Sequence, residues 1–221
     1  MKQKIDDVKK FTYKNLKWIV LFFCMIIFLA IAEDVFEKEI MKLDTIGYYF
    51  ISTYLISNVV TPIAKFITNL GGSFTLISIA LILLVCIKNK KIGICICGNL
   101  PIITGLNLLL KNIVQRPRPT QFRMISETGY SFPSGHSMVS MAFYGYLIYL
   151  VYKYVNNKKM KWSLITFLII LVVTIGLSRI YLGVHYTSDV VAGFTVSISY
   201  LVVYTSITKK YIIERENKNE K

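Results

Sequence analysis

The sequence predicts an all-α membrane protein: a six-span transmembrane helical bundle with an additional interfacial helix. Its 221 residues are 54% apolar and only 17% charged, whereas soluble domains carry about 25% charged residues. The net charge is nevertheless +14, from 26 Lys and Arg against 12 Asp and Glu. A disordered basic chain would be poor in apolar residues, and a soluble nucleic-acid-binding domain would lack long uncharged runs. Neither class fits, and no nucleic acid partner is expected.

Six charge-poor runs are the expected spans. Each is close to the roughly 17–25 residues that a spanning helix needs, and flanking Lys, Trp and Tyr extend the shorter ones. The runs are Trp18–Ala32, Ser73–Ile87, Ile92–Leu110, Met138–Tyr152, Trp162–Ser178 and Val190–Thr208. They leave little chain for a soluble domain, so residues 1–221 are expected to form a single integral membrane domain.

A seventh candidate runs from Leu43 to Leu70. It contains Asp44, Pro62 and Lys65, and apolar residues recur at helical spacing in its second half. Such a segment either crosses the bilayer or lies flat at its surface as an interfacial helix.

The Lys-rich segments choose between these alternatives, because short Lys-rich segments lie on the cytoplasmic side. They are Met1–Lys17, Lys88–Lys91, Lys153–Lys161 and Lys209–Lys221, and they hold 18 of the 26 basic residues. All four share one side only if the 43–70 segment does not cross. We therefore predict six spans, both termini in the cytoplasm and an interfacial helix on the outer face. Seven spans with a weaker charge rule are the alternative.

Three polar clusters lie beside span ends, where polar residues are costly and usually mark function. The first holds Lys111 and Arg118 on either side of a helix end that Pro117 and Pro119 impose. Snorkelling to the interface is the simpler explanation of these cations. Positive charge is disfavoured on the outer side, however, so its presence there indicates an anionic partner.

The second cluster is the sequence Pro133-Ser134-Gly135-His136 at the start of the fourth span. Ser134 is a favourable N-cap, and Gly135 lets a ligand approach the backbone closely. The amino terminus of a helix suits a phosphate group. Taken alone, this cluster is better explained as a capped helix start without a ligand.

The third cluster contains Arg179, His185 and Asp189. The last two are four residues apart and share a helix face, so Asp189 can hold one imidazole nitrogen and leave the other free. Arg179 supplies a planar fork that matches phosphate oxygens. An Asp–His pair that merely ties two helices together is the alternative. All three clusters fall at outer span ends. The Lys-rich segments that set this topology share no residue with the clusters, so the agreement is independent support.

The three clusters together resemble a known signature. Their pattern is Lys111, six residues, Arg118-Pro119; then Pro133–His136; then Ser178-Arg179, five residues, His185, three residues, Asp189. This resembles the three motifs of the type 2 phosphatidic acid phosphatase superfamily, in order and without departure at a defining position. The small size and outward site are similar to bacterial lipid phosphatases of the phosphatidylglycerophosphatase B and undecaprenyl pyrophosphate phosphatase kinds.

The resemblance implies a metal-independent phosphatase that works through a phosphohistidine. His185 would attack phosphorus, Asp189 would orient it, and His136 would protonate the leaving group. Five residues would hold the substrate phosphate: Lys111, Arg118, Ser134, Gly135 and Arg179. No cofactor or metal is expected, because Asp189 is the only acid in the clusters and the four cysteines lie in apolar runs without metal-ligand spacing.

The position of the clusters at headgroup level favours a lipid phosphate as substrate, in a bacterial plasma membrane and without an obligate protein partner. Undecaprenyl pyrophosphate is the first candidate, because an outward-facing site matches the face on which that carrier lipid is released. Phosphatidylglycerophosphate and phosphatidate are the alternatives. A lipid-phosphate transporter that uses the same cations as a binding site is the non-enzymatic alternative.

Overall fold

Residues 2–38 and 41–219 are described by a computed structural model, and all regular structure in this part of the chain is helical. Five residues lie outside it: Met1, Glu39, Ile40, Glu220 and Lys221. Met1, Glu220 and Lys221 belong to the predicted Lys-rich segments. The helices are α1 (Lys2–Phe36), α2 (Lys42–Tyr54), α3 (Val60–Leu70), α4 (Ser73–Cys86), α5 (Lys90–Val114), α6 (Gly135–Tyr154), α7 (Lys158–Tyr181) and α8 (Thr187–Asn219).

Four of these helices contain stretches that are long and apolar enough to cross a membrane. They are Asn15–Phe36 of α1, all of α5 and α7, and Thr187–Ile212 of α8. Helices α3 and α4 pass the same criterion together, as a pair bent by 49°. The protein is therefore a multi-pass, all-helical membrane protein with four or five candidate spans among the described residues.

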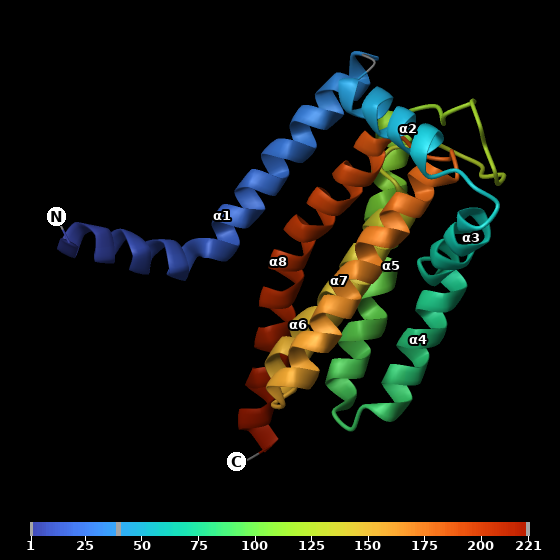
Figure 1. Cartoon of the computed structure of the whole chain (residues 1–221). Helices are drawn as coiled ribbons and strands as arrows, with labels where there is room; N and C mark the ends of the chain where they lie inside the picture. The colour runs from blue at the N-terminus through green and yellow to red at the C-terminus, as the bar shows by residue number, and fades with distance from the viewer. Residues whose placement is uncertain (1, 39–40, 220–221) are drawn as a thin grey trace.

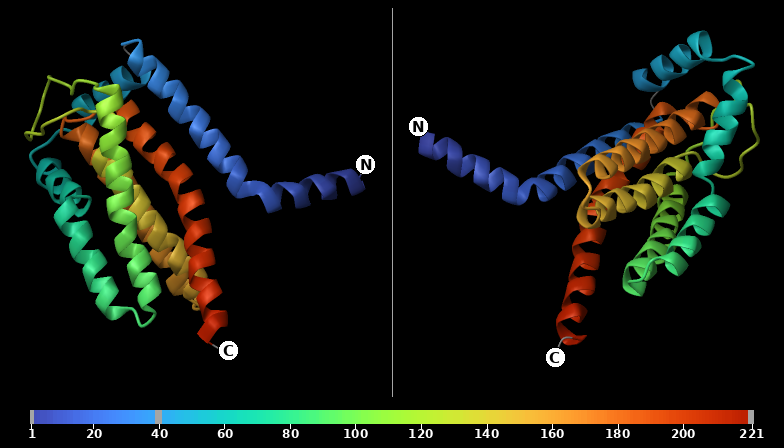
Figure 2. Two further views of the ribbon diagram at one scale, coloured as in Figure 1. Left: turned by 180° about the vertical axis from the view of Figure 1, so that it is seen from behind. Right: turned by 60° about the horizontal axis from the view of Figure 1, so that its bottom comes forward.

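Helix α6 lies at the centre of the bundle and packs against α5, α7 and α8. Helix α1 runs beside α8, and the α3–α4 pair lies on the far side, against α7 and α5 respectively (Figures 1 and 2). Tyr144, Tyr146 and Tyr204 line the interior together with aliphatic side chains. Tyr146 and Tyr204 contact each other edge to face, with ring centroids 5.1 Å apart, an arrangement that aromatic pairs favour.

Local sequence signals set the helix ends that matter for the site. Helix α5 ends at Val114 because Gln115 adopts a left-handed conformation ahead of Arg116-Pro117. Helix α6 starts after Ser134, whose side chain accepts a hydrogen bond from the Ser137 N–H. The end of α5 and the start of α6 lie at the same end of the bundle as the end of α7 and the start of α8 (Figure 1).

The prediction of one helix over residues 43–70 is wrong, because the segment forms two helices, α2 and α3. Ser57 interrupts it: its hydroxyl accepts from the Val60 N–H at 3.1 Å, and its own N–H donates to the Tyr181 hydroxyl at 3.2 Å. Pro62 then falls in the first turn of α3, where proline is tolerated. Helix α4 alone has 14 residues and rises about 21 Å, too short for a span without α3.

Candidate active site

The polar residues singled out in the sequence lie at the end of the bundle where α5 and α7 end, α6 and α8 begin, and loop 115–134 crosses over them (Figure 1). Two of the cations end helices: Lys111 lies in the last turn of α5 and Arg179 in the last turn of α7. Ser134 caps α6 and is followed by Gly135 and His136. Asp189 lies in the first turn of α8, Arg118 in loop 115–134 and His185 in the α7–α8 connection.

His185 and Asp189 form a buried pair, with Nδ1 of His185 3.3 Å from Oδ2 of Asp189. Only 3% of His185 and none of Asp189 is exposed. The same carboxylate oxygen accepts a hydrogen bond from the Tyr186 backbone N–H at 2.9 Å. On the other side of the ring, a guanidinium nitrogen of Arg118 lies 3.1 Å from Nε2. Because a guanidinium only donates, Nε2 accepts, and the ring proton lies on Nδ1.

The imidazole of His185 is neutral at physiological pH. Burial lowers the pKa of His185 to about 4; the positive charges of Arg179 and Arg118 act in the same direction, and the hydrogen bond and charge of Asp189 oppose them. A neutral ring with its proton on Nδ1 presents a lone pair on Nε2. That is the state a nucleophilic histidine needs.

Backbone carbonyl groups fix the Arg118 guanidinium next to this lone pair. Nε donates to Gly129 O, one terminal nitrogen to Thr128 O and the other to Val184 O, each at 3.0 Å. None of these partners carries a formal charge, so the positive charge of Arg118 is positioned without being neutralised. A cation held this way suits an oxyanion placed beside His185.

Arg179 is the most deeply buried cation of the cluster, with 1% of its surface exposed. It donates to Thr68 Oγ1 at 2.7 Å and to Glu127 Oε1 at 2.5 Å, while its Nε has no partner among the described residues. Burial alone would raise the pKa of Glu127, but the hydrogen bond and charge of Arg179 outweigh it and lower this pKa. The cation therefore holds a carboxylate that is 29% exposed and keeps one donor unused.

Glu127 is a site residue that sequence reasoning missed. It lies in loop 115–134, outside every motif, and reaches an arginine 52 residues away. The available signal was an acidic residue in a predicted outer loop, between the first and second polar clusters. Its carboxylate also adds a second acid to a site in which only Asp189 was expected.

The start of α6 is joined to both α5 and α8. The Ser134 backbone N–H donates to Asp189 O at 3.0 Å, and Asn107 of α5 donates to Pro133 O at 3.2 Å. A side chain at Gly135 would bring its Cβ within 3.1 Å of Asn107 Oδ1, so glycine lets the two helices approach closely. These contacts fix the amino terminus of α6 beside the Asp189 end of α8.

The remaining predicted residues surround this helix start. Ser134 caps α6 as predicted, and its hydroxyl oxygen accepts from Ser137 Oγ at 2.9 Å. Lys111 donates from Nζ to the Tyr130 carbonyl in loop 115–134. The charges of Arg179, Glu127 and His185 all act on His136, which therefore belongs to the same cluster.

A second residue missed by the sequence, Asp44 of α2, joins the site through Arg116. One terminal nitrogen of Arg116 donates to Asp189 Oδ1 and the other to Asp44 Oδ2, both at 2.7 Å. Asp44 also accepts from the backbone N–H and the hydroxyl of Ser188, at 2.8 and 2.9 Å. The guanidinium lies over the Tyr186 ring, 4.0 Å from its centroid. Arg116 thus ties the carboxylate behind His185 to α2.

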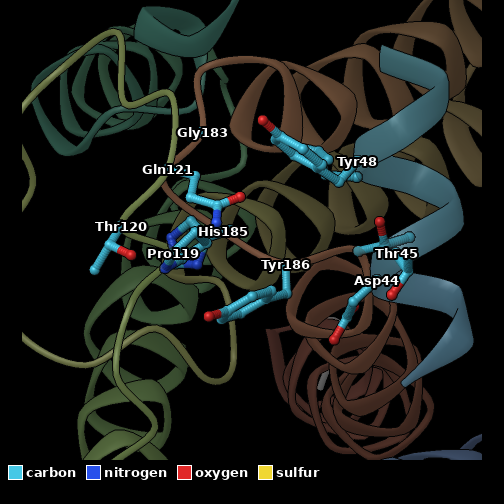
Figure 3. Close-up of a pocket in the computed structure, with 11 residues that line it drawn as sticks. Asp44, Thr45, Tyr48, Pro119, Thr120, Gln121, Gly183, His185 and Tyr186 are labelled. Carbon is cyan, nitrogen blue, oxygen red and sulfur yellow. The ribbon is translucent and has the colours of Figure 1, made fainter. Parts of the chain in front are cut away.

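A pocket of about 340 Å³ borders His185 on the side of α2, as Figure 3 shows. Asp44, Thr45 and Tyr48 form one wall, and Pro119 to Gln121 form the opposite one. None of the cations Lys111, Arg118 and Arg179 lines it. The pocket therefore flanks the cationic cluster rather than containing it.

Fold and site together define a class of protein: a multi-pass helical membrane protein with a buried His–Asp pair and several cations suited to a phosphoryl group. Residues 92–213, more than half of the chain, match the PAP2 superfamily. The chain belongs to the PAP2 superfamily, and the resemblance drawn from the three motifs is confirmed.

Two curated relatives illustrate the range of this family. The chain is 36% identical over 97 residues to phosphatidylglycerophosphatase B of Bacillus subtilis, covering 42% of this chain and 46% of the relative. It is 30% identical over 181 residues to the undecaprenyl-diphosphatase of Sulfolobus acidocaldarius, covering 78% and 80%. The chain thus spans about half the length of the first relative and most of the second.

Solved structures share the fold. The transmembrane PAP2 type phosphatidylglycerolphosphate phosphatase from Bacillus subtilis superposes with a TM-score of 0.76 at 24% identity, covering 86% of this chain and 96% of that one. LpxE of Aquifex aeolicus gives 0.60 at 20% identity, covering 72% and 92%. The helical architecture is therefore shared even where the sequence is not.

Proposed function

We propose that this chain is a metal-independent lipid phosphatase that hydrolyses a lipid phosphate or pyrophosphate through a phosphohistidine. One observation carries the proposal: the neutral His185 is held by Asp189 through Nδ1, and its Nε2 faces a fixed Arg118. The nucleophile therefore contacts an orienting carboxylate through one ring nitrogen and an oxyanion-binding cation through the other. This is the arrangement that covalent phosphoryl transfer needs.

In the first step, Nε2 of His185 attacks phosphorus. The N–P bond forms and the bond from phosphorus to the leaving oxygen breaks. His136, which takes up a proton from solvent when the negatively charged phosphate binds beside it, gives that proton to the leaving oxygen. The imidazolium formed on His185 is stabilised by Asp189. Phosphoryl oxygens are held by the side chains of Lys111, Arg118, Arg179 and Ser134 and by the Gly135 backbone N–H.

In the second step, water attacks the phosphohistidine. His136, now neutral, accepts a proton from the water as the new P–O bond forms and the N–P bond breaks. Inorganic phosphate leaves, and His185 returns to its neutral form. The chain's own cations balance the phosphoryl charge throughout, so activity is expected to persist in a chelator.

The membrane arrangement we propose has six spans: α1, the bent α3–α4 pair, and α5, α6, α7 and α8. Helix α6 has 20 residues, or about 30 Å, enough to cross the hydrocarbon core, and it lies among α5, α7 and α8. The Lys-rich segments then face the cytoplasm with both termini, and the site faces outward in a bacterial plasma membrane as part of a single domain, residues 1–221. Helix α2 would lie at the outer interface.

Undecaprenyl pyrophosphate is the substrate we place first. The outward site favours it, and a relative aligned over 78% of this chain is an undecaprenyl-diphosphatase. The terminal phosphate would pass to His185, and undecaprenyl phosphate would leave. Phosphatidylglycerophosphate, named in the other relative, and phosphatidate are the alternatives.

Phosphate release from a panel of lipid phosphates tests this function. The purified protein is assayed with each lipid, with and without chelator, beside His185→Ala. We expect release by the wild type in both conditions, fastest with undecaprenyl pyrophosphate, and none by the variant. If the wild type binds these lipids but releases no phosphate, the chain is a binding or transport protein instead.

A further inference from the structure

A basic cavity is lined by residues from the end of α6, the start of α7 and the second half of α8. These parts of the helices lie at the end of the bundle opposite the candidate active site (Figure 1). Its volume is about 550 Å³. Its described lining combines cationic and aromatic side chains without an acidic one: Tyr149, Tyr152, Lys153, Lys158, Lys161, Trp162 and Lys209.

The four lysines come from three helices and converge on this one cavity. Lys153 belongs to α6, Lys158 and Lys161 to α7, and Lys209 to α8. Among the described side chains, the ion pairs all lie at the other end of the protein, and none involves Lys158, Lys161 or Lys209. Lys161 lies over the Tyr152 ring, 5.4 Å from its centroid. Lys158, Lys161 and Lys209 therefore bring positive charge to the cavity that no described carboxylate neutralises.

An apolar groove of about 420 Å³ continues from the same place toward the middle of the span. It shares Tyr149, Tyr152 and Trp162 with the basic cavity. Its remaining walls are mainly aliphatic and come from α6, α7 and α8: Gly145, Ile148, Ile165, Ile198, Leu201 and Val202. Thr205 of α8 and Lys17 of α1 complete the lining. The three aromatic rings thus stand at the junction of a cationic compartment and an apolar one.

We propose that these two cavities form a binding site for one anionic phospholipid. The phosphate lies among the lysines, and an acyl chain lies in the groove. Basic pockets between spans bind anionic headgroups, and Trp and Tyr are favoured at the level where headgroup and chain meet. The site is remote from the His185 cluster, so it is independent of the proposed function.

The topology signal alone does not account for this arrangement. It requires lysines on one side of the membrane, not their convergence on a cavity that continues into an apolar groove. The Lys88–Lys91 segment shows the difference. Lys90 donates to the carbonyls of Leu84 and Val85 at the end of α4, and no lysine of that segment lines either cavity.

Matched lysine variants test the site. The double variant Lys158→Gln/Lys161→Gln removes one exposed and one half-buried lysine of the cavity. The control, Lys88→Gln/Lys91→Gln, also removes one exposed and one half-buried lysine at the same end of the bundle, but outside the cavity. Full-length protein in phosphatidylcholine nanodiscs is titrated with phosphatidylglycerol, and retained lipid is counted by native mass spectrometry. The first variant should lose affinity about fivefold per lysine, whereas the second should match wild type.

Three results would overturn the proposal. Equal losses of phosphatidylglycerol affinity in the two variants would mean a diffuse charge effect. Phosphatidylglycerol held at the candidate active site cannot cause a difference between the variants, because it contributes equally to both. Wild-type protein that does not prefer phosphatidylglycerol to phosphatidylcholine would remove the headgroup site. Protection from thermal unfolding by inorganic phosphate that equals the protection by phosphatidylglycerol would mean that the occupant is a free anion, not a lipid.

Discussion

The protonation of His185 sets the acid limit of the proposed reaction. Burial holds its folded pKa at about 4 against an ordinary 6.5, so the nucleophile stays neutral where a solvent-exposed histidine would be half protonated. We expect kcat/KM measured against pH to show an acid limb well below 6.5. The free energy of unfolding should change over the same pH range, because the unfolded state binds a proton at His185 more readily than the folded state. The contribution of His185 to stability is present above pH 6.5 and is lost as the pH falls toward about 4. An acid limb at or above 6.5 would contradict a buried neutral nucleophile.

Arg116 illustrates how a residue that touches no reacting atom can control the reaction. It separates two buried carboxylates, Asp44 and Asp189, and fixes the one behind His185. Arg116→Gln leaves both uncompensated and should destabilise the protein by roughly 3–5 kcal/mol. It should also lower kcat roughly 100-fold through misplacement of the nucleophile, with KM nearly unchanged.

A double-mutant cycle with Asp44→Asn separates positioning from general damage. In the Arg116→Gln/Asp44→Asn protein only Asp189 still carries its charge, so part of the lost stability should return, measured by thermal unfolding. If the loss of stability in the double variant equals the sum of the losses in the two single variants, Arg116 and Asp44 do not act through each other. A rise in KM without a fall in kcat would place Arg116 in contact with substrate instead.

The α7–α8 connection and loop 115–134 depend on a single glycine. Gly183 has φ +70°, and a Cβ there would lie 2.4 Å from the Phe122 carbonyl oxygen. Gly183→Ala should displace the loop that carries Arg118 and lower both the thermal midpoint and kcat. Gly129 is the matched control: it has φ +71° but open space around it. Gly129→Ala should therefore cost only about 1 kcal/mol of backbone strain. Equal effects in the two variants would argue against the close contact.

Helix ends were predictable from sequence because their causes are local. Pro117 stops α5, and Ser134 caps α6. Asp44 and Glu127 were not predictable as site residues, because each reaches its partner through the tertiary fold: Asp44 contacts Ser188 across 144 positions. Division of the 43–70 segment into α2 and α3 depended likewise on a distant partner, the Tyr181 hydroxyl that binds Ser57. The motifs therefore predicted the cluster and its chemistry, and the fold added the carboxylates that balance its cations.

At the scale of the whole molecule, opposite ends of the bundle carry different kinds of charge. One end holds cations fixed by carbonyls and carboxylates around His185; the other holds the lysines of the basic cavity. Because the lysines act as an orientation signal, the His185 end should face outward. This placement determines which lipids can reach the nucleophile, so orientation and substrate are linked predictions.

Cysteine accessibility tests that orientation directly. In a background where Cys24, Cys86, Cys95 and Cys97 are replaced by Ser, Ser126→Cys reports the active-site loop and Asn156→Cys the α6–α7 connection; both positions are exposed. An impermeant maleimide should label Ser126→Cys in intact cells and Asn156→Cys only after permeabilisation. The opposite pattern would place the His185 cluster in the cytoplasm and remove the argument for undecaprenyl pyrophosphate. Only α6 separates the two positions, so labelling of both in intact cells would mean that α6 does not cross the membrane and would contradict the six-span arrangement.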